Sequence, residues 1–223
     1  NRNKTNRELI HNTNEKLSAT ESKMEALRNI TERYDGYGNS IRRVMEQKQW
    51  NPGIIGVVAD IITVNQKYEV AVETALGGSI QNIVTEDDAT AKRMISYLKT
   101  NRLGRATFLP LNTITDRGSV KNDVLREKGV IGVASDLVEV DSKFNTLVKN
   151  LLGRIIVVDN IDNALAVARK NNQSLRLVTR EGELINPGGS MTGGAFRNSS
   201  NLLGRKRELD ELKEQIDNLK STA

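Results

Sequence analysis

The chain has 223 residues, with 33 Lys and Arg against 28 Asp and Glu, and a net charge of +5. This length is enough for one large domain or two small ones, and the charge permits contact with nucleic acid without establishing it. The absence of cysteine excludes a disulfide framework, a thiol nucleophile and a cysteine-based zinc site, and it fits a reducing cytoplasm. No apolar run has the length of a membrane span, and the N-terminus lacks a signal-peptide pattern.

Both ends of the chain are polar and helical in pattern. Residues 1–33 contain neither Gly nor Pro, and Ile10, Leu17 and Met24 recur every seven residues, as in a coiled coil. A second apolar seam lies within residues 202–220: Leu209, Leu212, Ile216 and Leu219. Neither segment buries enough apolar surface to be stable alone, so we expect the two to pair as antiparallel helices. Two unrelated surface helices are the alternative. The polar start of the chain indicates a piece of a longer protein.

The middle of the chain alternates short β-branched runs with helical spacing. Strands are expected at 54–64, 80–84, 106–109, 130–134, 155–158 and 175–178. Helical spacing occurs at 40–48, 68–76, 91–98, 144–152 and 161–168. The pattern predicts an α+β fold. A short similarity between the segments that follow Ile83 and Val157 indicates two related subdomains.

Two Gly-Gly pairs, Gly188-Gly189 and Gly193-Gly194, follow a predicted hairpin near residues 175–185. Glycine tolerates positive φ and lets another backbone come close. The cluster therefore indicates either a tight turn or a surface where a phosphate or a second protein chain packs on the main chain.

Several kinds of chemistry are absent from the pattern. No lysine follows Gly194 as a Walker A loop requires, although Arg197 could still meet a phosphate, so a nucleotide site stays open as a minor alternative. The only histidine, His11, lies in the polar N-terminal helix, away from any predicted site. Asp87 and Asp88 could be imagined as metal ligands, but helix capping explains them more simply. We expect no catalytic residue, no metal and no cofactor.

Basic residues gather near the junctions with the helical ends. They are Arg42, Arg43 and Lys48 on the entry side, and Arg197, Arg205, Lys206 and Arg207 on the exit side. Such groups could neutralise phosphates and would make binding depend on salt, whereas the alternative is a solvated charged face. Trp50 and Phe108 are expected in the core or an interface rather than as stacking platforms. The basic residues are not interleaved with aromatic residues, so the pattern does not indicate single-strand binding.

Together, these motifs resemble the hinge domain of SMC proteins, most of all the homodimeric bacterial members. Gly53 to Asp60 is similar to the family's Gly-x-x-Gly-x-x-x-Asp entry, and Gly104 to Leu111, read Gly-Arg-Ala-Thr-Phe-Leu-Pro-Leu, is similar to its most recognisable stretch. Further matching stretches are Tyr68 to Gly77, Gln81 to Val84, Leu152 to Arg154, and Gly182 to Gly194. The resemblance covers about residues 35–200.

The resemblance implies a two-subdomain hinge fold with flanking antiparallel coiled-coil helices. We expect an N-terminal arm over 1–34, hinge subdomains over 35–140 and 141–200, and a C-terminal arm over 201–223. Two hinges are implied to form a homodimer through strand edges, with Gly188, Gly189, Gly193 and Gly194 at the contact and Gly77 and Gly78 as further candidates.

The resemblance also implies a role in chromosome condensation and segregation in the cytoplasm, at the nucleoid. It implies that the ATPase motifs lie in head domains outside this fragment, which is then no enzyme by itself. Family hinges contact DNA, and the basic residues Arg205, Lys206, Arg207, Arg197, Arg42 and Arg43 are our candidates for that contact. A DNA-binding module whose dimerisation is secondary is the alternative function.

Overall fold

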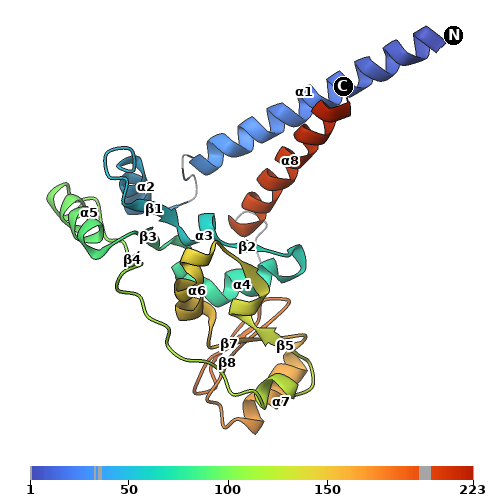
Figure 1. Ribbon diagram of the computed structural model, residues 1–223. Coiled ribbons are helices and arrows are strands. Elements are labelled where there is room, and N and C mark those ends of the chain that lie inside the picture. Colours follow the sequence, from blue (N-terminus) through green and yellow to red (C-terminus); the bar gives the residue numbers. More distant parts are fainter. Residues whose placement is uncertain (1, 33, 35–36, 196–201, 223) are drawn as a thin grey trace. The chain divides into compact units, whose positions relative to one another are not determined.

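The computed structural model describes residues 2–32, 34, 37–195 and 202–222 (Figure 1). The chain divides into two compact units, which are described separately. One unit joins residues 1–35 to residues 204–223, and the other comprises residues 36–203.

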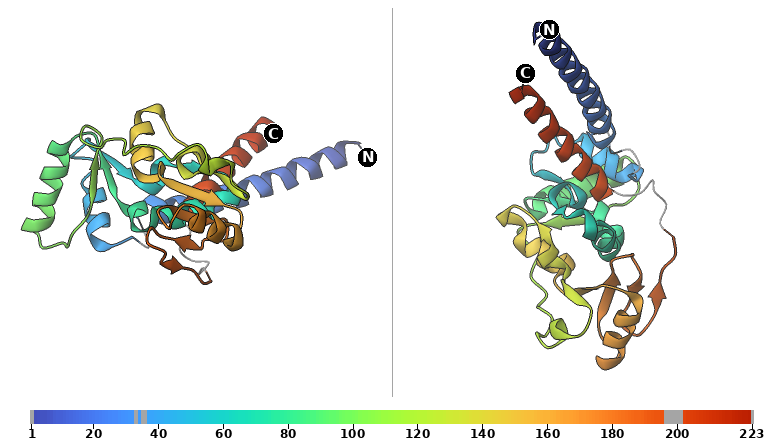
Figure 2. Two further views of the ribbon diagram at one scale, coloured as in Figure 1. Left: turned by 90° about the horizontal axis from the view of Figure 1, so that it is seen from below. Right: turned by 90° about the vertical axis from the view of Figure 1, so that its right-hand side faces the viewer.

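The first unit is a pair of long helices, α1 (Arg2–Glu32) and α8 (Leu202–Thr222). Both chain ends lie at the same end of this pair, so the helices are antiparallel, as predicted (Figures 1 and 2). Ile216 of α8 is buried, and Lys220 Nζ lies 3.9 Å from Glu21 Oε1 of α1. The predicted seam is partly confirmed in α1, because Leu17 and Met24 are half-buried whereas Ile10 is exposed.

The second unit contains a three-stranded sheet in the order β1-β3-β4. Its strands are β1 (Ile54–Val57), β3 (Ile83–Thr85) and β4 (Phe108–Pro110). The pair β1–β3 is antiparallel and the pair β3–β4 is parallel, with α5 (Asp88–Thr100) as the crossover helix. Asp87 caps α5 by accepting a hydrogen bond from the Thr90 backbone N–H at 2.8 Å, which confirms the capping role predicted for this pair of aspartates.

The second sheet of this unit has five strands in the order β10-β9-β8-β7-β5. Its strands are β5 (Val130–Val133), β7 (Ile155–Val158), β8 (Arg176–Thr179), β9 (Leu184–Ile185) and β10 (Met191–Thr192). The crossover helix α7 (Ile161–Lys170) joins the parallel pair β7–β8 and packs its buried face on this sheet. All four residues of β7 are buried, as expected for a central strand.

The two sheets are built from one repeated plan. Residues 53–57 read Gly-Ile-Ile-Gly-Val and residues 129–133 read Gly-Val-Ile-Gly-Val, and each forms a strand with a register irregularity. Each strand leads through a helical turn to a short strand, and the short strands β2 (Thr63–Val64) and β6 (Val138–Glu139) pair with each other. Helices α4 (Glu69–Leu76) and α6 (Asn145–Leu152) then lead into β3 and β7. The sequence similarity noted after Ile83 and Val157 covers only the later part of this duplication.

Two predicted features are placed differently by the structure. The run 54–64 was expected to be one strand, but α3 (Val58–Ile61) interrupts it, because the Asp60 carboxylate accepts a hydrogen bond from the Val57 N–H at 3.2 Å and starts a helical turn. The expected division between residues 140 and 141 also differs from the strand pairing. Strand β5 pairs with β7, so the second sheet begins at Val130.

Candidate dimer interface

The glycine cluster forms the turn between β9 and β10, the last hairpin of the five-stranded sheet. The Asn186 N–H donates to the Ser190 carbonyl at 2.9 Å, and the Gly189 N–H donates to the Asn186 carbonyl at 2.9 Å. Gly188 and Gly189 have φ values of +92° and +100°, which side chains other than glycine rarely adopt. The turn itself therefore requires glycine at these two positions.

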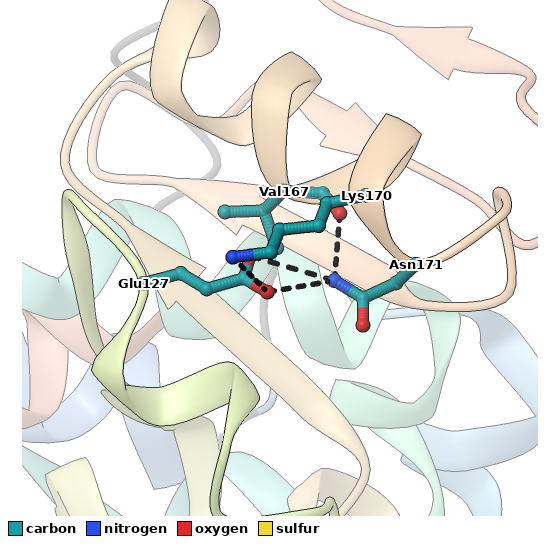
Figure 3. Close-up of polar contacts among 4 residues, drawn as sticks. All are labelled: Glu127, Val167, Lys170 and Asn171. Carbon is teal, nitrogen blue, oxygen red and sulfur yellow. Dashed lines mark hydrogen bonds and ion pairs between the residues drawn. The ribbon is translucent and has the colours of Figure 1, made fainter.

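A neighbouring loop holds this turn in place. The Gly188 N–H donates to the Gln173 carbonyl at 2.7 Å, and Gln173 has a left-handed φ of 58°. That loop follows α7, where Asn171 Nδ2 donates to Glu127 Oε1 at 3.2 Å and to the Val167 carbonyl at 2.8 Å (Figure 3). Lys170 Nζ lies 4.0 Å from the same Glu127 oxygen. The glycine turn is thus anchored on the end of a packed helix.

Gly193 and Gly194 come directly after β10 and differ from the first pair. Gly193 does not have positive φ, and a Cβ added there would lie 3.4 Å from Glu183 Cγ, which is ordinary contact. Gly194 has φ of +131°, and a Cβ there would meet no described atom within 4 Å. Nothing inside the described chain therefore requires Gly193 to lack a side chain.

Strand β10 is the outermost strand of its sheet, and both of its residues are exposed. The Met191 side chain is 52% exposed, which is unusual for a large apolar group. An uncovered edge strand offers backbone donors and acceptors to another chain. The exposed edge and the following glycines together form a surface suited to main-chain pairing.

The other sheet edges are covered to different extents. Lys48 Nζ donates to the Ile55 carbonyl at 2.8 Å and so covers part of the β1 edge. A 3₁₀ turn at Val124–Arg126 packs beside β5. Within the described residues no further strand pairs with β4 on the side away from β3. In the two larger sheets, the outer edges of β4 and β10 are thus the ones for which the described residues provide neither a strand partner nor a covering contact identified above.

Gly77 and Gly78 lie after α4, apart from the glycine turn in sequence. Gly77 has φ of +53°, and its N–H donates to the Glu73 carbonyl, so it ends the helix as predicted. Gly78 is exposed and does not have positive φ, and a Cβ there would meet no described atom within 4 Å. The fold requires glycine at the first of these positions only.

The candidate DNA-binding residues are divided between the two units. Arg42 and Arg43 are exposed on α2 (Asn39–Glu46), where Arg43 Nε lies 3.8 Å from Glu46 Oε2. Arg205, Lys206 and Arg207 are half-buried in α8, and Arg207 Nη1 lies 3.2 Å from Glu211 Oε1. Arg197 lies outside the described residues. No group of three or more His, Asp or Glu suited to a metal ion occurs in the described part of the chain.

Comparison with known proteins decides the family. Residues 51–168 match the family described as "SMC proteins Flexible Hinge Domain". The chain is 41% identical over 214 residues to the chromosome partition protein Smc of Desulfitobacterium hafniense. This alignment covers 93% of the present chain and 18% of that protein. The chain belongs to the SMC hinge family. It is the hinge of an SMC protein rather than the ATPase head, and it spans about a fifth of the length of the relatives it matches.

Solved SMC hinges share this fold. An asymmetric dimer of the Geobacillus stearothermophilus SMC hinge domain matches with a TM-score of 0.91 and 34% identity, covering 98% of this chain and 89% of that one. The Pyrococcus furiosus Smc hinge domain with an extended coiled coil matches with a TM-score of 0.61 and 30% identity. The match covers 97% of the present chain and 80% of the Pyrococcus furiosus chain. The predicted α+β hinge with flanking helices is confirmed. Among the described residues, no helix is both long and apolar enough to cross a membrane.

Proposed function

We propose that this hinge forms a homodimer in which β10 of one copy pairs with the edge of β4 in the other. The observation that carries the proposal is the open β10 edge followed by Gly193, a glycine that the fold does not require. A second backbone can approach such a position because no Cβ stands in the way. The open edge of β4 offers the complementary strand.

A symmetric dimer of this kind contains the same contact twice. The five-stranded sheet of each copy meets the three-stranded sheet of the other, so the pairing closes and does not extend into a fibre. Gly188 and Gly189 hold the turn that presents β10, and Gly194 keeps the approach clear. Gly77 and Gly78 are proposed as a further part of the contact, supported by the exposure of both residues.

We propose that the dimer joins two long coiled-coil arms at their apex in a chromosome-organising ATPase. The paired helices α1 and α8 are the hinge-proximal parts of one arm, and the relatives of matching sequence are named chromosome partition proteins. The full protein then acts in chromosome condensation and segregation in the cytoplasm at the nucleoid, with ATP hydrolysis in its head domains.

DNA is the second proposed partner of the hinge. The positive net charge and the exposed Arg42 and Arg43 support a contact with phosphates. Arg205, Lys206, Arg207 and Arg197 remain candidates for the same role. The salt dependence of DNA binding, measured in the experiment of the next section, tests this contact independently of dimerisation.

The dimer proposal is tested by sedimentation equilibrium of Gly193→Val and a matched control, Gly132→Val. Gly132 lies on β5, at the other edge of the same sheet, does not have positive φ and has no described atom within 4 Å of an added Cβ. The unaltered chain and the control should sediment at about twice 24.7 kDa. Gly193→Val should sediment as a folded monomer at micromolar concentration. Dimerisation of Gly193→Val at unchanged affinity would contradict the proposed interface.

A further inference from the structure

The only tryptophan of the chain, Trp50, is 67% exposed. A tryptophan side chain is large and mostly apolar, and folded proteins usually cover it. The structure therefore contradicts a core position for Trp50, whereas Phe108 is half-buried as a strand residue. The exposed indole needs an explanation of its own.

The turn that carries Trp50 is firmly held. The Trp50 N–H donates to the Gln47 carbonyl at 3.1 Å, and Asn51 donates to the same carbonyl through its N–H at 3.0 Å and its side chain at 3.3 Å. Lys48 Nζ donates to the Ile55 carbonyl at 2.8 Å. These hydrogen bonds fix the backbone of the turn that carries the indole. A ligand would therefore not have to order the turn before binding.

The segment with Trp50 lies beside α5 and the loop that follows it. Three proximities in reverse sequence order join the two segments. A Cβ added at Gly104 would lie 3.7 Å from Ser40 Cβ, Gln47 is hydrogen bonded to Tyr97, and a Cβ added at Gly53 would collide with Thr90 Oγ1. The second of these is a hydrogen bond of 3.4 Å between Gln47 Nε2 and the Tyr97 hydroxyl. Figure 1 shows α2 and α5 as neighbours. Residues 39–53 and 88–105 therefore form one continuous surface, which we call the Trp50 surface.

The Trp50 surface is strongly basic. Residues 39–53 contain three basic residues and one acidic residue, and residues 88–105 contain five basic residues and one acidic residue. Glu46 is paired with Arg43, and Asp87, just before α5, lies near Arg93, which also donates to Thr90 Oγ1 at 3.2 Å. The excess of positive charge around an exposed indole is complementary to a chain that carries both phosphates and aromatic rings.

We propose that Trp50 is a stacking platform for an unpaired base, with the basic side chains of α2 and α5 holding the phosphates of a single strand. This inference rests on the proposed DNA contact and names the form of DNA that the hinge takes. A single strand exposes the faces of its bases to an aromatic side chain, whereas the bases of a duplex are already stacked on each other.

The proposed dimer contact does not account for the exposure of Trp50. That contact takes the edges of β4 and β10, whereas the Trp50 turn is hydrogen bonded to β1, the opposite edge of the three-stranded sheet. A second copy seated on β4 would leave the indole open. Single-stranded nucleic acid is the occupant that matches both the indole and the surrounding charge.

The experiment uses the fluorescence of Trp50 as its probe, because Trp50 is the only tryptophan of the chain. The chain is titrated at low salt with a 20-nucleotide oligothymidine and, separately, with a blunt 20-base-pair duplex. Saturable quenching is expected with the single strand, together with weaker binding as salt is raised. Little quenching is expected with the duplex. Equal quenching by the duplex would overturn the stacking proposal.

Variants separate stacking from charge. In an anisotropy assay with labelled oligothymidine, Trp50→Ala should weaken binding by about 5-fold to 100-fold, and Trp50→Phe by less, since phenylalanine retains an aromatic face. Arg43→Gln should reduce affinity, whereas Arg154→Gln, at an exposed arginine in the turn before β7, should not. Unchanged binding by Trp50→Ala would overturn the proposal.

Sedimentation of the same samples keeps the two proposals distinguishable. Trp50→Ala should remain a dimer while losing affinity for oligothymidine. Emission that shifts on dilution of the protein, and not on addition of DNA, would show that a second chain covers Trp50 and would likewise overturn the proposal. A monomeric chain that still quenches with oligothymidine would contradict the dimer interface alone.

Discussion

The two sheets of the hinge begin with the same plan and end differently. Each starts with an irregular strand, passes through a short helix and closes with a parallel strand–helix–strand unit. The first sheet stops there, at β4, whereas the second continues into β9 and β10. The shared plan builds the two cores, and the added hairpin builds the surface that we assign to dimerisation.

The comparison also shows how a duplicated fold acquires asymmetry. The equivalent edges, β1 and β5, each have a local segment beside them: Lys48 covers part of β1, and the 3₁₀ turn at Val124–Arg126 packs beside β5. The opposite edges differ, because β4 ends the first sheet with no strand paired beyond it in the described residues, whereas β10 is an addition. Since the two open edges are not alike, one copy can pair with another through unlike edges, and two such contacts close a dimer.

The largest expected effect comes from breaking each core at the same point. Ile83 and Ile156 occupy equivalent strands and are both fully buried. Ile83→Ala and Ile156→Ala should each lower the free energy of unfolding by about 2–5 kcal/mol, because each leaves a cavity. Urea unfolding at one fixed protein concentration measures both. A negligible loss in either variant would show that the two cores are not equivalent.

A smaller effect separates the glycines that the fold requires from those it does not. Gly188→Ala should destabilise the chain by about 1–2 kcal/mol, because alanine is strained at positive φ. Gly78→Ala should change stability by no more than about 0.5 kcal/mol, since its φ is ordinary and its surroundings are open. Thermal unfolding of the two variants side by side provides the measurement. Equal destabilisation would mean that Gly78 has a structural role.

The smallest effect concerns the caps of the equivalent helices α5 and α7. Hydrogen bonds from the Thr90 backbone and hydroxyl, with a further effect of Arg93, hold the pKa of Asp87 below its usual value. A carboxyl with a lower pKa in the folded state stabilises the fold above its unfolded pKa, and this contribution is lost as pH falls below about 4.

At α7 the cap is Asn160, which accepts from the Asn163 N–H at 2.9 Å and does not titrate. Asp87→Asn should therefore keep the cap of α5 and remove its share of the acid dependence of unfolding. Asn160→Ala should cost about 1 kcal/mol at every pH. An acid profile that is identical in Asp87→Asn and the unaltered chain would contradict this assignment.

Much of this fold is readable from local pattern. The helix over Glu69–Leu76 and its end at Gly77 follow from apolar spacing and a glycine, and the hairpin from Arg176 to Ile185 follows from two apolar runs around a turn. The tight turn at Gly188 and Gly189 also follows from the glycines themselves. These features depend on residues close together in sequence, so the sequence alone could predict them.

The remaining features are not set by apolar spacing: one follows from a local side-chain hydrogen bond, and the others follow from contacts between distant residues. A β-branched run from Ile54 to Val64 predicts one strand, and only the hydrogen bond between Asp60 and Val57 explains the break. The pairing of β5 with β7 and the exposure of Trp50 are likewise set by tertiary packing. A sequence pattern does not show which of several apolar residues the fold leaves uncovered.

The central claim is that unlike edges of two copies pair, and cysteine cross-linking tests it most directly because the chain has no cysteine of its own. Thr107, next to β4, and Thr192, in β10, are both exposed. Under mild oxidation, Thr107→Cys mixed with Thr192→Cys should form a covalent dimer, whereas neither variant should cross-link with itself. Self-linkage of Thr192→Cys, or failure of the mixture to cross-link, would contradict the pairing of β10 with β4.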